Sequence, residues 1–312
     1  MPSSLPTRTP STNRAYQNRA EQLIRRFKHE HGKCWRAHPE AFYDWLINRR
    51  EEFAKATWRQ YKSALVYFFM DQGFTALALQ LSQVINQGCT HRSQNTSAKK
   101  LKKLTDRDLR KLVGKLCEGN GRHDQLIAAW LVAGIATGLR PCEWQFARLD
   151  GDTLIVKNAK ATNGRAHGPA RRLHLDTLTP EQKNIIAAFI SRIQDFADFG
   201  QLQKQCGDRL FRVTRCLWPK RQQHITLYSA RHQFAANTKC AGLSLTEIAA
   251  LMGHATDNTA SQHYGRRTAG NRGQTPRANQ SDMANVRKTY TARQADGTPN
   301  IDSDAGPAFN TS

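Results

Sequence analysis

The chain lacks the marks of a membrane or secreted protein. No apolar run approaches the roughly 18 residues of a membrane span, and no hydrophobic signal-peptide core follows the polar residues 1–11. Its seven cysteines are scattered and none form a CxxC pair, which argues for reduced thiols and against a disulfide framework. There are no internal repeats. We therefore expect a protein of the cytoplasm, or alternatively of a nucleus, that has no membrane partner.

Acidic residues are scarce. The 25 Asp and Glu residues are outnumbered by 47 Lys and Arg residues, so the net charge is +22 and the pI is about 10.1. Such a charge says nothing about the fold, but it favours a polyanionic partner. Nucleic acid suits this balance better than a membrane surface.

A recognisable metal-binding pattern is missing as well. One group of side chains that can bind zinc lies near the end of a predicted helix: His29, His31, Cys34 and His38. Their spacing matches no established zinc pattern, and the segment is typical of the polar end of a helix that runs into a loop. We expect no bound metal.

The length of 312 residues suggests about two domains. Residues 1–11 are rich in Ser, Thr and Pro and are predicted to be disordered. Residues 12–88 have helical apolar stripes with many cations between them, which predicts a helical DNA-binding domain. Residues 89–104 are polar, basic and without periodicity, so we expect a linker that lies along a phosphate backbone.

Residues 105–269 are predicted to form a second domain of several helices and a small sheet. The only clear strand signal, at residues 153–156, is paired across a Gly/Asn turn with residues 172–175. Residues 270–312 are polar and are predicted to be a C-terminal tail. The expected fold class is therefore α+β, mainly α with a small β-sheet.

Two arginines in this second domain lie at predicted helix starts. Arg140, in Ala136-Thr-Gly-Leu-Arg-Pro-Cys-Glu143, follows a helix-stopping glycine and opens the next predicted helix. Arg231, in Leu227-Tyr-Ser-Ala-Arg231, is predicted to begin a helix, where the dipole disfavours a cation. Because guanidinium groups bind phosphate oxygens in bidentate fashion, both positions suggest an anionic ligand.

A histidine and a tyrosine follow. His254 comes just past the helix-ending Gly253 and is predicted to be displayed rather than buried. Tyr264 lies in a polar run, which is typical of a surface phenol. A phenol on a mobile segment can act as a nucleophile and hold a cleaved strand covalently.

Together these motifs resemble the tyrosine recombinase (phage integrase) family. Its catalytic domain has an A-T-G-x-R-x-x-E segment, a lysine in a β-hairpin, an H-x-x-R helix start, an L-G-H motif and a tyrosine soon after it. The chain matches them with Arg140 and Glu143, Arg231, Met252-Gly-His254 and Tyr264. The resemblance covers most of residues 105–267, and residues 12–88 look like the family's core-binding domain.

The resemblance implies a metal-free and cofactor-free transesterification of DNA. Arg140 and Arg231 would hold the scissile phosphate, His254 would support it, and Tyr264 would attack it to give a 3′-phosphotyrosine. Glu143 would hold the Arg140 guanidinium in place. The lysine that protonates the departing 5′-oxygen would be Lys160, in the hairpin turn, with Lys157 at the strand end as the alternative.

Two departures from the family pattern affect the mechanism. Tyr228 stands where the family usually has a histidine, three residues before Arg231. A phenol can donate a hydrogen bond to phosphate but is a poor base at neutral pH, so we expect Tyr228 to position the phosphate. In addition, Tyr264 follows His254 by ten residues, one more than is usual in the family.

The expected partner is double-stranded DNA at recombination sites, bound by a homo-tetramer on two duplexes, with or without an accessory protein. Because no room for an arm-binding domain precedes Thr12, we expect a compact recombinase of a mobile genetic element. The alternatives are a type IB topoisomerase-like enzyme and a catalytically silent DNA-binding accessory protein. The residues expected to bind the DNA backbone are Arg59, Lys62, Lys99, Lys100, Lys102 and Lys103.

Overall fold

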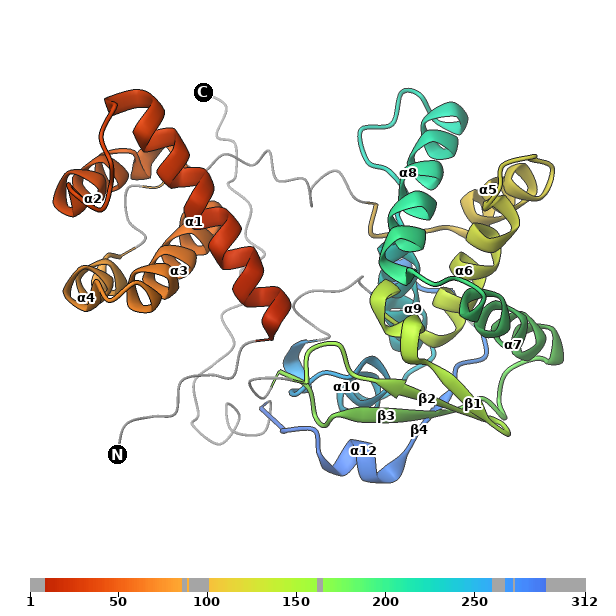
Figure 1. The fold of residues 1–312 in the computed structure, drawn as a ribbon. Helices are drawn as coiled ribbons and strands as arrows, with labels where there is room; N and C mark the ends of the chain where they lie inside the picture. Colours follow the sequence, from red (N-terminus) through yellow and green to blue (C-terminus); the bar gives the residue numbers. More distant parts are fainter. Residues whose placement is uncertain are drawn as a thin grey trace, which may run out of the picture. The chain divides into compact units, whose positions relative to one another are not determined.

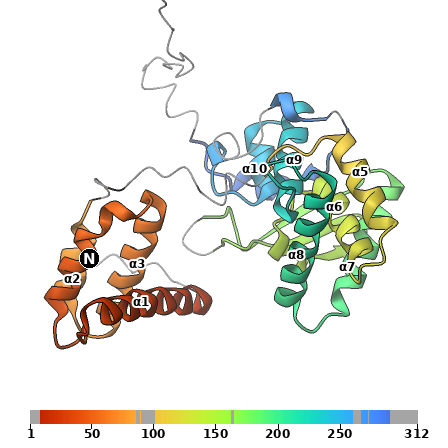
Figure 2. The same ribbon diagram turned by 90° about the horizontal axis from the view of Figure 1, so that it is seen from above.

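The computed structural model describes residues 9–85, 89, 101–161, 165–259, 267–271 and 273–289. The chain divides into two compact units, Met1–Ala98 and Lys99–Ser312, which are drawn in Figures 1 and 2. Among the described residues, none of the helices is both long enough and apolar enough to cross a membrane.

Unit 1 is a helical bundle around an aromatic core (Figure 1). Its elements are α1 (Pro10–His31), α2 (Pro39–Asn48), η1 (Arg50–Glu52), α3 (Lys55–Asp71) and α4 (Thr75–Gln83). The Phe27 ring packs edge-on against Phe42 and Trp45. Because the Thr9 side chain caps α1, the helix begins at Pro10, and residues 10 and 11 are helical where disorder was predicted.

Unit 2 is built around one helix that is apolar on all sides. This helix, α6 (Asp124–Thr137), packs against its neighbours α5, α7, α8 and α9, and a helix with no polar face is stable only when it is enclosed. The Thr105 side chain caps α5, and capping boxes begin α7 and α10. The remaining helices are α5 (Asp106–Cys117), η2 (Pro141–Phe146), α7 (Pro180–Gln194), α8 (Phe199–Leu217), α9 (Leu227–Cys240), α10 (Leu245–Met252), η4 (Arg267–Ala269) and α12 (Gln280–Ala284).

A four-stranded antiparallel sheet lies beside these helices, in the order β1-β2-β3-β4. Its strands are β1 (Arg148–Asp150), β2 (Thr153–Lys157), β3 (Ala170–His174) and β4 (Arg277–Ala278). Helix α10 packs on β3 and β4, and α12 packs on α10 (Figure 1). Residues 277–284 are therefore part of the folded unit, although they fall in the stretch predicted to be a polar tail. The predicted fold class, mainly α with a small sheet, is confirmed.

Candidate active site

Arg140 lies between the end of α6 and the start of η2. Gly138 ends α6 with a left-handed backbone (φ 70°), and a Cβ there would collide with the Phe234 ring, so the turn requires glycine. The backbone N–H of Arg140 donates to Oε2 of Glu143 at 2.8 Å, and its guanidinium donates to Oε1 at 2.5 Å. Both side chains are buried. Glu143 therefore holds the Arg140 guanidinium in one orientation.

Arg231 is fully buried in the second turn of α9, and the prediction that it begins the helix is wrong. The helix begins four residues earlier because Thr226 and Ser229 form a reciprocal cap. The guanidinium donates to the carbonyl oxygens of Gly138, at 2.6 Å, and of Met252, at 2.7 Å. Arg231 thus ties the turn that carries Arg140 to the end of α10.

His254 is 2% exposed, so the prediction of a displayed histidine is wrong. Gly253 ends α10 with a left-handed backbone (φ 65°) and turns the chain inward. The Nε2 atom of His254 lies 3.0 Å from the Arg231 guanidinium, which has only donors, so Nε2 accepts and the ring proton sits on Nδ1. Burial and the nearby charge of Arg231 lower the pKa of His254 far below its usual value, so the imidazole is neutral at pH 7.

Arg171 is a member of the cluster that was not recognised in the sequence. It is fully buried on β3 opposite Val156 of β2, and donates to Oε2 of Glu143 and to the Leu251 carbonyl oxygen, both at 2.8 Å. It also donates to the Asn158 side chain. A signal was present, because Arg171 is two residues before the buried Leu173 and therefore lies on the same face of the strand. A cation in an apolar register is unusual unless a partner is buried with it.

The cluster is rich in positive charge. Glu143 lies 2.5 Å from Arg140, 2.8 Å from Arg171 and 3.8 Å from Arg231, so among the described residues three guanidinium charges face one carboxylate. Burial opposes ionisation of Glu143, but the three arginines outweigh it and lower the pKa of the carboxyl far below its usual value. A buried group of cations of this kind favours binding of an anion.

The two candidate lysines lie at the end of β2 and at the start of the loop that follows it. Lys157 ends β2, is exposed, and its Nζ lies 5.2 Å from the centre of the Phe146 ring. Lys160 is exposed three residues further on. The Asn158 side chain between them is buried and donates to the Gly168 carbonyl oxygen at 2.9 Å, which closes the base of the hairpin.

Of the two candidate tyrosines, Tyr228 lies within the described residues. Tyr228 is half-buried in the first turn of α9, one turn before Arg231 and on the same side of the helix, and its ring packs edge-on against His232. Tyr264 lies outside the described residues, as do Lys99 and Lys100. The structure therefore brings Arg140, Glu143, Arg231 and His254 together and is silent on the predicted nucleophile.

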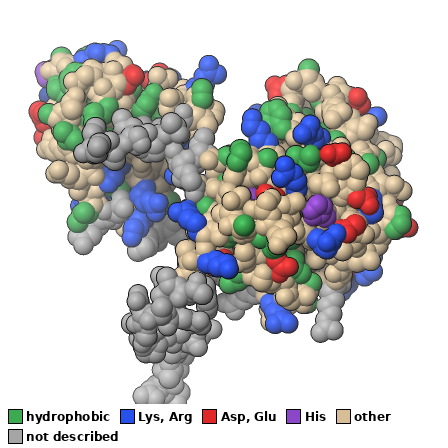
Figure 3. Space-filling view, turned by 90° about the horizontal axis from the view of Figure 1, so that it is seen from below, with side chains coloured by type: hydrophobic (Ala, Val, Ile, Leu, Met, Phe, Trp, Pro, Cys, Tyr) green, Lys and Arg blue, Asp and Glu red, His purple; other side chains and the backbone are tan. Residues whose placement is uncertain are grey.

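The other predicted DNA-binding cations differ in whether their charged groups are exposed or bonded within the protein. Arg59, Lys102 and Lys103 are exposed, and Figure 3 shows Lys and Arg side chains on the surface of both units. Lys62 instead donates to the carbonyl oxygens of Ser82, at 3.3 Å, and Val84, at 2.8 Å, at the end of α4. Its ammonium group stabilises a helix terminus in unit 1.

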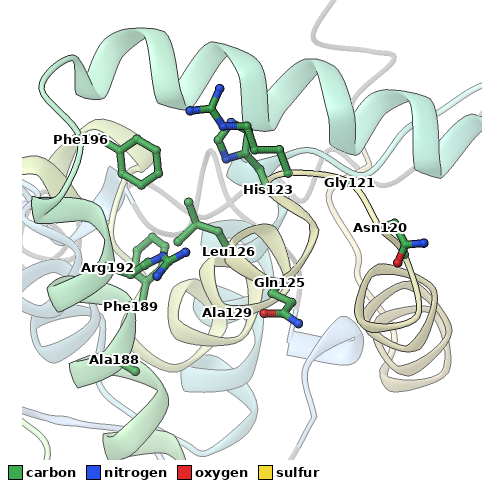
Figure 4. A pocket seen from close by; sticks show the side chains of 12 residues that line it. Asn120, Gly121, His123, Gln125, Leu126, Ala129, Ala188, Phe189, Arg192 and Phe196 are labelled. Atoms are coloured by element: carbon green, nitrogen blue, oxygen red, sulfur yellow. The ribbon is translucent and has the colours of Figure 1, made fainter.

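A pocket of about 490 Å³ lies elsewhere in unit 2 (Figure 4). Leu126, Phe189 and Phe196 give it an apolar wall, and Arg192 and His123 are also part of its lining. None of the predicted site residues lines it. Within the part of the chain that is described, no three His, Cys, Asp or Glu side chains come close enough to hold a metal ion.

No family model matches this chain, and no curated protein matches it. Among solved structures, it is similar to XerA recombinase, with 14% identity, a TM-score of 0.38, and coverage of 82% of this chain and 95% of that one. It is also similar to XerH site-specific recombinase bound to palindromic difH substrate (15% identity, TM-score 0.46, coverage 70% and 66%). A third is a lambda integrase dimer bound to a COC′ core site (15%, 0.43, 84% and 82%).

Proposed function

We propose that this protein is a site-specific DNA recombinase that cleaves and rejoins strands through a 3′-phosphotyrosine. The observation that supports the proposal is the convergence of Arg140, Arg231 and His254 around Glu143, where Arg171 adds a third guanidinium charge to the same carboxylate. These groups come from three separate segments, and no metal or second carboxylate is needed to bind a phosphodiester there. The motif resemblance supplies the nucleophile, Tyr264.

In the proposed reaction the two guanidinium groups bind the non-bridging oxygens of the scissile phosphate, where charge develops in the transition state. The Tyr264 oxygen forms a bond to phosphorus and loses its proton, while the bond from phosphorus to the 5′-oxygen breaks. Lys160 gives a proton to that leaving oxygen. One phosphodiester replaces another, so the reverse reaction with a new 5′-hydroxyl rejoins the strands without a nucleotide cofactor.

His254 is suited to a supporting role. Because Nε2 accepts from Arg231, the proton on Nδ1 is the one that would donate to a phosphate oxygen. The same contact orients the Arg231 guanidinium. His254 would therefore act by donating a hydrogen bond and by positioning Arg231.

The biological setting belongs to the same proposal. Recombination would require two duplexes and four active sites, so the active form would be a homo-tetramer in the cytoplasm, with or without an accessory protein. The role would be integration, excision or cointegrate resolution for a mobile genetic element. A type IB topoisomerase-like enzyme shares the chemistry, and would instead relax plasmids at arbitrary sequences.

The test is incubation of the protein with nicked duplexes that carry candidate recombination sites, so that the cut strand cannot be rejoined. A covalent complex should accumulate, and the peptide that carries the nucleotide should contain Tyr264. Tyr264→Phe should bind the DNA and form no adduct. A wild-type protein that binds these sites and traps no strand would instead support a catalytically silent DNA-binding protein.

A further inference from the structure

Gln233 joins three distant segments of unit 2. It is buried on α9, two residues past Arg231. Its Oε1 accepts from the backbone N–H of Leu104 at 2.8 Å, at the end of the predicted basic linker. Its Nε2 donates to Oδ1 of Asn237, at 2.8 Å, and to the Ala269 carbonyl oxygen, at 2.9 Å. One amide therefore contacts the linker end, its own helix and η4.

Asn237 extends this contact by one helical turn. Its Oδ1 also accepts from the backbone N–H of Asn271 at 2.9 Å, and the Asn271 side chain donates to Asp106 in the first turn of α5. Between these bonds the backbone of Gly270 lies directly on α9, so close that a Cβ would collide with the Ala236 carbonyl oxygen. Residues 269–271 are therefore fastened to α9 by two side chains and a close backbone approach.

This attachment limits where the chain just before it can go. Tyr264 precedes Arg267, the first residue of η4, by three residues, and three residues span at most about 11 Å. The helix to which η4 is fastened is the one that carries Arg231. Attachment of residues 267–271 to α9 therefore bounds the distance between the nucleophile and the phosphate-binding arginine of the same chain.

We propose that Gln233 and Asn237 are positioning residues that couple the linker end and the segment after Tyr264 to the phosphate-binding helix. The inference rests on the proposed function. In this proposal neither residue contacts the reacting atoms. They act by holding Leu104, at the linker end, and residues 269–271, which follow Tyr264, on helix α9. DNA bound along the basic linker and the nucleophile are thereby both linked to the helix that carries Arg231.

Four variants test this proposal, each by changing one of the contacts with α9 or, in the control, by keeping it. Gln233→Glu keeps the acceptor for Leu104 but sets a carboxylate against the oxygens of Ala269 and Asn237. Gly270→Ala lifts the segment from α9. Asn237→Leu removes the acceptor for Asn271, whereas its matched control, Asn237→Asp, keeps an acceptor of the same shape. Asn237 is only partly buried, so this pair remains informative if the Gln233 variant fails to fold.

The readouts are the rate of covalent complex formation at saturating nicked DNA, the DNA affinity, and hydrogen exchange of the Leu104 and Asn271 amides. Gln233→Glu, Gly270→Ala and Asn237→Leu should form the adduct about ten- to a hundredfold more slowly, the effect expected of a small displacement of a reacting group. Their DNA affinity should be unchanged, and Asn237→Asp should retain the wild-type rate. In Asn237→Leu the Asn271 amide should exchange faster.

Wild-type rates in Gln233→Glu and Asn237→Leu would overturn the inference, as would an equal loss of rate in Asn237→Asp. A loss of DNA affinity that parallels the loss of rate would also overturn it, because that result indicates a structural role alone. If the wild-type protein traps no DNA, the proposed function fails. Unchanged exchange at Asn271 in Asn237→Leu would then refute the attachment independently.

Discussion

At the residue scale, the site is organised by one carboxylate. Glu143 bonds to the backbone and the guanidinium of Arg140, and to Arg171, and faces Arg231. Arg171 in turn reaches Asn158 at the hairpin base and the Leu251 carbonyl oxygen near the end of α10. Removal of the carboxylate would leave three buried cations in mutual repulsion. Glu143 is therefore expected to matter for folding as much as for orientation of the arginines.

Glu143→Gln should lower the free energy of unfolding by about 3–5 kcal/mol, the usual cost of removing one partner from a buried ion pair. The pH dependence follows from the lowered pKa. Folded Glu143 stays ionised while the unfolded carboxyl titrates near its ordinary value of 4.5. Its contribution is thus complete above pH 4.5 and decreases as the pH falls below it, because only the unfolded state takes up the proton.

Urea unfolding at pH values from 7 down to 3.5 measures this effect. The variant should lose less stability than the wild type over the acidic part of the range, because it lacks the titrating group. Glu118→Gln, which alters an exposed carboxylate, is the control and should follow the wild-type curve. An acid slope that is unchanged in Glu143→Gln would contradict the assignment.

The choice between Lys160 and Lys157 is a second prediction at this scale. Replacement of the bridging 5′-oxygen by sulfur removes the need for a general acid, because a thiol has a pKa near 8.5 and departs as a thiolate. Lys160→Met should be strongly defective on ordinary DNA and regain activity on the sulfur-bridged strand. Lys157→Met should cleave both strands at nearly wild-type rates. The reverse pattern would assign the acid to Lys157.

Tyr228 is expected to position the phosphate through its hydroxyl and not to activate the nucleophile. Tyr228→Phe should therefore slow cleavage by about tenfold, the scale of one lost hydrogen bond to a charged group, while adduct still forms. The measurement is single-turnover cleavage beside Tyr264→Phe. Complete loss of the adduct in Tyr228→Phe would show that its role has been misassigned.

At the element scale, the turn that ends α10 packs closely against Asn158 and Arg171. A Cβ at Gly253 would run into Asn158 and Arg171 in addition to the strain of its left-handed backbone. Gly242 has the same handedness (φ 85°) and open space around it. The two glycines therefore separate backbone strain from steric contact.

Gly242→Ala should cost about 1–2 kcal/mol of unfolding free energy, the strain of a left-handed residue that has a side chain. Gly253→Ala should cost a further 1–3 kcal/mol, roughly the effect of overpacking a filled interior. Denaturant titration of both variants measures the difference. Equal losses would mean that the α10 turn accommodates a methyl group without displacing Arg171.

The β2–β3 hairpin was predicted from its local pattern, whereas β4 and α8 were missed. The caps of α5, α7 and α10 each depend only on neighbouring residues. Strand β4 has two residues, and its conformation comes from pairing with Leu173 and His174, about a hundred positions away. Helix α8 was overlooked although its buried stripe, from Phe199 through Leu202, Cys206 and Leu210, follows helical spacing.

At the scale of the whole molecule, the net charge of +22 predicts how DNA binding responds to salt. Contact with six to ten phosphates would weaken binding by roughly 10³–10⁵ between 50 and 200 mM salt. The double variant Lys102→Gln/Lys103→Gln should reduce the slope of log affinity against log salt by about two. Lys183→Gln, which removes a partner of Asp152, is the control and should leave the slope unchanged. A slope unaffected by the double variant would exclude these lysines from the DNA interface.

Local patterns in the sequence were enough to predict the fold class, mainly α with a small sheet, and the motif resemblance pointed to Arg140, Glu143, Arg231 and His254, which the structure brings together. Those features depend on neighbouring residues and on motifs that can be read along the chain. Contacts between segments far apart in the chain bury His254 and Arg231, bring Arg171 into the site and attach η4 to α9. Only this long-range packing places the Glu143 carboxylate among three arginines, because no local sequence pattern specifies that arrangement.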